Sequence, residues 1–73
     1  MIQEYKRRID KDKGILTKTI NGCLKKNVEK EKIEKLYETY IDLLVGLYPT
    51  EIKDEIYIIF EKHTQRLRKR GVI

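Results

Sequence analysis

A single proline separates two segments with helical periodicity in the larger, C-terminal part of this chain. Pro49 follows residues 28–47, VEKEKIEKLYETYIDLLVGL, and precedes residues 51–69. In both segments apolar side chains recur at i, i+3, i+4 and i+7, which places them on one face of an α-helix. Proline disfavours helical geometry at the residue before it. The sequence therefore predicts two helices, one on each side of Pro49.

The ends of these two helices carry residues that commonly begin or end a helix. Asn27 stands before the first segment and Thr50 before the second, and both residue types are favoured N-caps. Gly71 follows the second segment, where a glycine commonly ends a helix in a left-handed conformation. We therefore expect Asn27 and Thr50 to cap their helices and Gly71 to end the last one.

The stretch GILTKTING, residues 14–22, has a different character. Four of its side chains are β-branched and a glycine stands at each end, which favours a strand over residues 15–21. Leu16, Ile20 and Leu24 are also spaced i, i+4 and i+8, so a helix is the alternative. Before this stretch, residues 1–14 are mostly charged and are predicted to form a basic arm. A short helix is the alternative there, because Ile2, Tyr5 and Ile9 have helical spacing.

The pentapeptide IYIIF at residues 56–60 indicates that the protein associates with a second copy of the chain. Five consecutive apolar residues on a helix point around its whole circumference, and one neighbouring helix cannot cover them all. A chain of 73 residues with one Cys and one His has no intrachain disulfide and no zinc site of its own to reinforce a small core. We therefore expect a homodimer without a cofactor.

The net charge and the distribution of apolar residues limit which partners the protein can have. The formal net charge is +5, which favours an anionic partner. No uninterrupted apolar run approaches the roughly 20 residues of a membrane span, and the N-terminus lacks the apolar core of a signal peptide. We expect a cytoplasmic protein with no membrane partner. Enrichment in Lys and Glu is typical of hyperthermophiles, and an AT-rich genome is the alternative explanation for the abundance of Lys, Ile and Tyr.

The order of elements resembles that of the ribbon-helix-helix DNA-binding proteins, the class of the Arc, MetJ and CopG repressors. The residues that carry the resemblance are ILTKTIN at 15–21, the helix from residue 28, and PTEIKDEIYIIFEKH at 49–63. The resemblance implies a mainly α fold with one short strand, in which two chains intertwine and pair their strands into an antiparallel ribbon. That ribbon enters the major groove of DNA. Small members of the class are common in viruses and plasmids of hyperthermophilic archaea.

The resemblance also implies domain boundaries and has one departure. A basic arm at 1–14 precedes a ribbon-helix-helix domain at 15–73. The family passes quickly from ribbon to first helix, whereas here GCLKK intervenes. The ribbon is therefore either residues 15–21 or residues 23–28.

Site residues follow from the same resemblance. The expected contacts to DNA bases come from the ribbon: Thr17, Lys18, Thr19 and Asn21. The expected phosphate contacts are Thr50, Lys25, Lys26, Arg7 and Arg8. The expected dimer core comprises Leu16, Ile20, Leu44, Ile56, Ile59 and Phe60. A basic cluster near the C-terminus is expected either to stabilise the helix end, to contact DNA or to bind another partner: Arg66, Arg68, Lys69 and Arg70.

No catalytic constellation, metal motif or glycine-rich phosphate loop is visible, so we expect a protein that is not an enzyme and has no small-molecule substrate. The leading prediction is a homodimeric, sequence-specific protein that binds double-stranded DNA and regulates transcription. The alternative is a small helical interaction module that docks on a larger nucleoprotein assembly.

Overall fold

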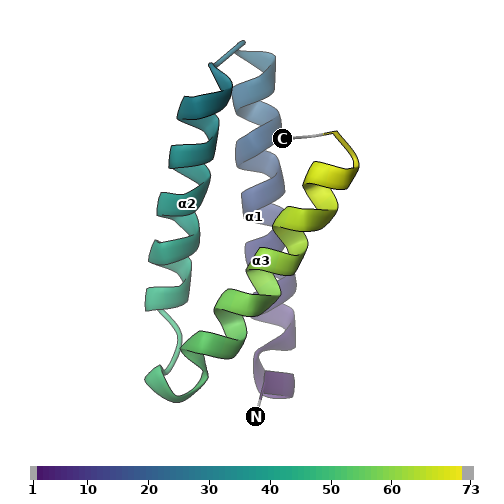
Figure 1. Cartoon of the computed structure of the whole chain (residues 1–73). Helices are drawn as coiled ribbons and strands as arrows, with labels where there is room; N and C mark the ends of the chain where they lie inside the picture. The colour runs from purple at the N-terminus through teal and green to yellow at the C-terminus, as the bar shows by residue number, and fades with distance from the viewer. Residues whose placement is uncertain (1, 72–73) are drawn as a thin grey trace.

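Within residues 2–71, which the computed structural model describes, the chain forms three α-helices and two short 3₁₀ helices, the latter labelled η1 and η2. The elements in chain order are η1 (Ile2–Tyr5), α1 (Lys6–Lys25), α2 (Lys30–Gly46), η2 (Thr50–Ile52) and α3 (Lys53–Lys69). A short turn reverses the chain between α1 and α2, which lie side by side and antiparallel, and α3 crosses them obliquely (Figure 1). The bundle is elongated, with principal extents of 39 × 19 × 16 Å.

The prediction of a ribbon-helix-helix fold is wrong. Residues 2–71 contain no strand, and the proposed ribbon at 15–21 lies in the middle of α1. The alternative ribbon at 23–28 covers the end of α1 and the following turn. The boundary expected between residues 14 and 15 also falls inside α1. An intertwined dimer needs paired strands, so the resemblance to that family does not hold.

Packing explains why residues 15–21 are helical. Ile9, Leu16 and Ile20 share one face of α1 and are at most 4% exposed. Burying each such side chain contributes about 1.5–3 kcal/mol, whereas a β-branched residue in a helix costs only a few tenths. The hydroxyls of Thr17 and Thr19 donate to the carbonyls of the residues four before them. The helical spacing therefore outweighs the strand propensity of the individual residues.

The two helices predicted around Pro49 are confirmed, with small changes at their ends. Asn27 does not cap α2: it lies in the preceding turn with a φ of 56°, and Glu29 occupies the N-cap. Thr50 begins η2, and no side-chain hydrogen bond caps that element. Gly71 has a φ of 74° and its N–H donates to the carbonyl of Arg68 at 3.0 Å, as expected of a glycine that ends a helix.

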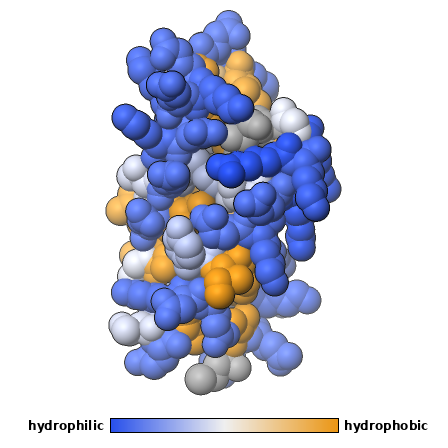
Figure 2. All heavy atoms as spheres, in the orientation of Figure 1, coloured by the Kyte–Doolittle hydropathy of each residue, from blue (hydrophilic) through white to orange (hydrophobic). Residues whose placement is uncertain are grey.

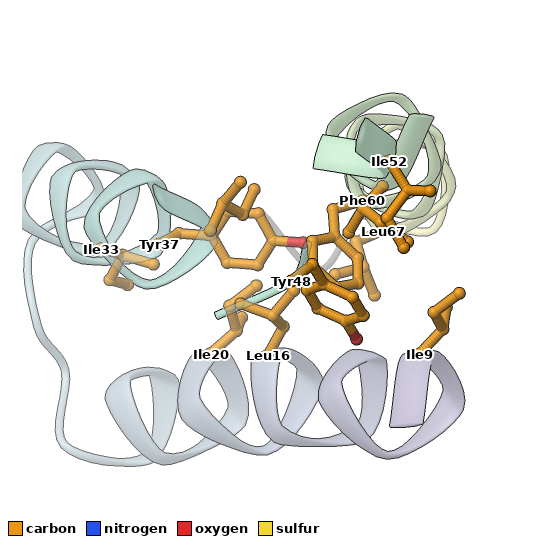
Figure 3. Close-up of a cluster of buried hydrophobic side chains, with 11 residues drawn as sticks. Ile9, Leu16, Ile20, Ile33, Tyr37, Tyr48, Ile52, Phe60 and Leu67 are labelled. Carbon is orange, nitrogen blue, oxygen red and sulfur yellow. The ribbon is translucent and has the colours of Figure 1, made fainter. Parts of the chain in front are cut away.

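The hydrophobic core lies inside one chain and draws on all three helices (Figure 3). Its buried apolar members are Ile9, Leu16, Ile20, Ile33, Tyr37, Ile41, Tyr48, Ile52, Ile56, Phe60 and Leu67. The residues expected in a dimer core mostly belong to this one, with Leu16, Ile20, Ile56 and Phe60 buried and Leu44 and Ile59 partly buried against it. In the IYIIF segment only Tyr57 and Ile58 stay exposed, at 44% and 53%. A second chain is therefore not needed to cover most of this segment.

Two hydrogen bonds between distant side chains satisfy polar groups inside the core. The Tyr48 hydroxyl donates to Asp12 Oδ2 at 2.6 Å, and the Thr64 hydroxyl lies 2.9 Å from the Tyr37 hydroxyl. Within residues 2–71 no buried side-chain nitrogen or oxygen lacks a partner. None of the described helices is both long and apolar enough to cross a membrane.

Candidate nucleic-acid interface

Helix α1 has a formal charge equal to the whole net charge of the protein. Its seven Lys and Arg residues outnumber its two Asp residues by five, and the whole chain has a formal net charge of +5. The formal charges of the remaining residues therefore add up to zero. Helix α1 is therefore the element most favourable for binding an anionic partner.

One face of α1 points away from the bundle and holds cations without carboxylates. Its residues follow the spacing i, i+4, i+7, i+11, i+14 and i+18, which keeps them on one side of a helix. We call this set the outer face of α1, and it comprises Arg7, Lys11, Gly14, Lys18, Asn21 and Lys25. All six are exposed. The buried residue Leu16 is two positions from Lys18, roughly 200° around a helix of 3.6 residues per turn, so this face lies opposite the core.

The two carboxylates of α1 lie elsewhere on the helix. Asp12 is 6% exposed and accepts the hydrogen bond from Tyr48. Asp10 lines a groove between α1 and α3. Asp12 is therefore removed from the outer face, whereas Asp10, which is exposed and three residues after Arg7, borders that face and offsets part of its positive potential.

The structure brings four of the expected DNA-contacting residues together on this face. Lys18 and Asn21, expected at bases, lie there with Arg7 and Lys25, expected at phosphates. The expectation from the sequence placed Lys18 and Asn21 on a strand, Arg7 in the N-terminal arm, and Lys25 after the ribbon at 15–21 or within the alternative ribbon at 23–28. Gly14 was not among the expected contacts, and Lys11 was expected only as part of the basic N-terminal arm, although a helical interpretation of residues 7–25 would have included both through the same spacing.

The other expected contacts lie in different places. The hydroxyl of Thr17 is 3.0 Å from His63 Nε2 and donates to the carbonyl of Lys13. The hydroxyl of Thr19 donates to the carbonyl of Ile15. These two threonines are thus engaged within the bundle rather than presented to a ligand.

Arg8, Lys26 and Thr50 are not on the outer face either. Arg8 donates to the carbonyl of Leu47 at 3.0 Å and its guanidinium stacks 4.2 Å from the centre of the Tyr48 ring. Lys26 is exposed in the turn after α1, and Thr50 is exposed at the start of η2. Arg8 therefore ties α1 to the end of α2 and has a structural role.

The remaining surface is mostly hydrophilic with isolated apolar areas. Figure 2 shows this for the side on which α3 lies in front. The most exposed large apolar side chains belong to Leu43 and Leu47, at 62% and 67%. They lie at the C-terminal end of α2 and just after it.

Within residues 2–71 no group of three or more His, Cys, Asp or Glu side chains is arranged to hold a metal ion. Cys23 is a free, half-buried thiol. No protein-family model, curated protein or solved structure matches the chain significantly. The function must therefore be inferred from the surface of the protein itself.

Proposed function

We propose that the protein binds double-stranded DNA through the outer face of α1. The observation that supports this most is the arrangement of four cations and no carboxylate along one exposed face of a helix. Four residues of this face were also predicted from the sequence to contact DNA: Arg7, Lys18, Asn21 and Lys25. Here they belong to a helix surface and not to a ribbon.

The length of the outer face suits an extended polyanion. From Arg7 to Lys25 the rise is roughly 27 Å at 1.5 Å per residue. Each strand of duplex DNA has one phosphate per about 3.4 Å of helix axis, so this length, measured along the axis, spans about eight phosphates of a strand. A small anion would contact only one or two of the four cations. Regularly spaced phosphates can engage all of them.

The shape of α1 suits the major groove, which admits an α-helix. Gly14 lies near the middle of the outer face and has no side chain, so the backbone can approach the DNA closely. Arg7 and Lys25 at the two ends are placed for phosphates. Lys18 and Asn21 are placed for base edges, where Lys pairs with guanine and Asn with adenine. Sequence preference, and with it a role in transcription, depends on these two residues.

This mode of binding does not require a second copy of the chain. The expectation of a homodimer depended on a ribbon and on an uncovered IYIIF segment. Residues 15–21 are helical, and Ile56, Ile59 and Phe60 pack inside one chain. A monomer with α1 in the groove is the simplest form of the proposal.

Salt dependence of binding tests the proposal. The affinity for a fluorescein-labelled duplex of about 20 base pairs is measured by anisotropy between 50 and 300 mM KCl. Engagement of phosphates by Arg7, Lys11 and Lys25 predicts a slope of log K against log salt of about −2.7. Absence of binding at 50 mM KCl, or a slope shallower than about −1, would contradict it.

A further inference from the structure

A second cationic site lies between α1 and α3, on a different side of α1 from its outer face. It is a groove of about 330 Å³, within the usual range of ligand sites. Its apolar wall is formed by Ile2, Ile9 and Ile59. Its charged rim is formed by Lys6 and Lys13 of α1, Lys62 and Arg66 of α3, and the single carboxylate of Asp10. We call this site the α1–α3 groove.

The rim of the α1–α3 groove has an excess of positive charge. Four cations and one carboxylate line it, and like charges on facing helices repel each other. The neighbouring His63 is affected by the same field. Its pKa is lowered by burial and by the nearby cations Lys13 and Arg66. An anionic ligand would relieve this repulsion.

The spacing of the cations indicates a ligand with several negative charges. Lys6 and Lys13 are two helical turns apart, roughly 10 Å, and Lys62 and Arg66 are one turn apart, roughly 6 Å. A single carboxylate or phosphate would contact only part of this rim. The isoleucine wall in turn calls for apolar groups, which the backbone of a nucleic acid does not offer.

From the combination of an isoleucine wall and a dispersed cationic rim we propose that the α1–α3 groove binds an acidic, amphipathic segment of another protein. Apolar side chains of that segment pack on Ile9 and Ile59, and its carboxylates pair with the four cations. This is the helix-in-groove mode of recognition with charge complementarity at the rim. The site is separate from the outer face of α1, so the protein has one surface for DNA and one for a protein partner.

A designed peptide provides the probe for this site. A labelled peptide of about 16 residues carries Leu at i, i+3, i+4 and i+7 and Glu at its other positions. Its binding to the full chain is followed by fluorescence anisotropy at 150 mM KCl. Two matched peptides replace all Leu with Ser or all Glu with Lys. The proposal predicts at least tenfold weaker binding of both.

Two charge-reversed variants of the protein locate the site. The double variant Lys62→Glu/Arg66→Glu is expected to bind the acidic peptide at least tenfold more weakly. The control Lys32→Glu/Lys35→Glu makes the same change in net charge at exposed positions of α2 and is expected to change the affinity less than twofold. Equal loss in both variants, or no binding of the acidic peptide by the parent chain, would overturn the proposal.

Duplex DNA and backbone NMR separate this proposal from the proposed function. Lys62→Glu/Arg66→Glu leaves the outer face of α1 unchanged, so its affinity for duplex DNA is expected to differ less than threefold from that of the parent chain. Amide shifts on addition of the acidic peptide are expected to concentrate in residues 6–13 and 59–66. Shifts confined to α2, or shifts that grow with protein concentration without peptide, indicate another surface or self-association and would overturn the assignment.

Discussion

The Tyr48 hydroxyl donates a 2.6 Å hydrogen bond to Oδ2 of Asp12, 36 residues earlier in the chain. Both side chains are buried, at 3% and 6% exposure. Arg8 covers the other side of the Tyr48 ring, at 4.2 Å from its centre. This cluster fixes the chain after α2 against the N-terminal half of α1, and thereby helps to fix the end of α2 relative to α1.

Removal of the Tyr48 hydroxyl is expected to destabilise the protein. Tyr48→Phe leaves the buried Asp12 side chain without this donor, which costs about 1–3 kcal/mol. Urea denaturation followed by far-UV circular dichroism measures the change. A double-mutant cycle with Asp12→Ala is the control, since the combined loss should be smaller than the sum of the two single losses. A strictly additive result would show that the two side chains do not interact.

Titration of His63 is expected to make the fold less stable at mildly acidic pH. Burial and the cations Lys13, Arg66 and Arg70 lower its pKa below the ordinary value of 6.5, so the folded state favours the neutral ring. The stabilisation is complete above pH 6.5 and is lost as the pH falls through the lowered pKa. Denaturation midpoints from pH 8 to 4.5 should therefore fall more steeply for the parent chain than for His63→Gln. Identical profiles would contradict this prediction.

The sequence predicts the second half of the fold better than the first. Residues 28–47 and 51–69 have uninterrupted apolar periodicity with Pro49 between them, and both helices are present. In residues 14–22 the local propensity of β-branched residues and glycines competes with the longer-range spacing of Leu16 and Ile20. Burial of the Leu16 and Ile20 side chains against α2 and α3 makes this stretch helical. The free energy of that burial cannot be evaluated from the local sequence, because it depends on the partner helices.

The candidate site could also be predicted only in part from the sequence. The cations Arg7, Lys18 and Lys25 can be recognised from the sequence, but their common face depends on residues 6–25 being one helix. The α1–α3 groove combines residues more than 40 positions apart, such as Lys13 and Lys62. No local pattern in the sequence brings them together.

Replacement of Gly14 by alanine is expected to stabilise the protein. Gly14 lies inside α1, and a Cβ there would have no heavy atom within 4 Å. Alanine is more favourable than glycine inside a helix by about 0.5–1 kcal/mol. A rise in the thermal midpoint measures this gain, and Gly22→Ala, whose Cβ also meets nothing within 4 Å, should behave in the same way. A loss of stability in both variants would contradict a continuous α1.

Two leucines distinguish the core of one chain from an obligatory dimer. Leu16 is 0% exposed and Leu43 is 62% exposed. Leu16→Ala is expected to cost about 2–5 kcal/mol, whereas Leu43→Ala is expected to stay within about 0.5 kcal/mol. Urea denaturation at two protein concentrations measures both. A large loss for Leu43→Ala that depends on protein concentration would show that α2 is buried against a second copy.

The most direct test of the account is the affinity of two charge-reversed variants for duplex DNA. Lys18→Glu/Lys25→Glu changes the outer face of α1, and Lys32→Glu/Lys35→Glu makes the same change in net charge on exposed positions of α2. We expect at least tenfold weaker binding for the first variant at 100 mM KCl and less than a threefold change for the second, with unchanged circular dichroism. Equal weakening would mean that only the overall charge attracts DNA, and would contradict binding through the outer face of α1.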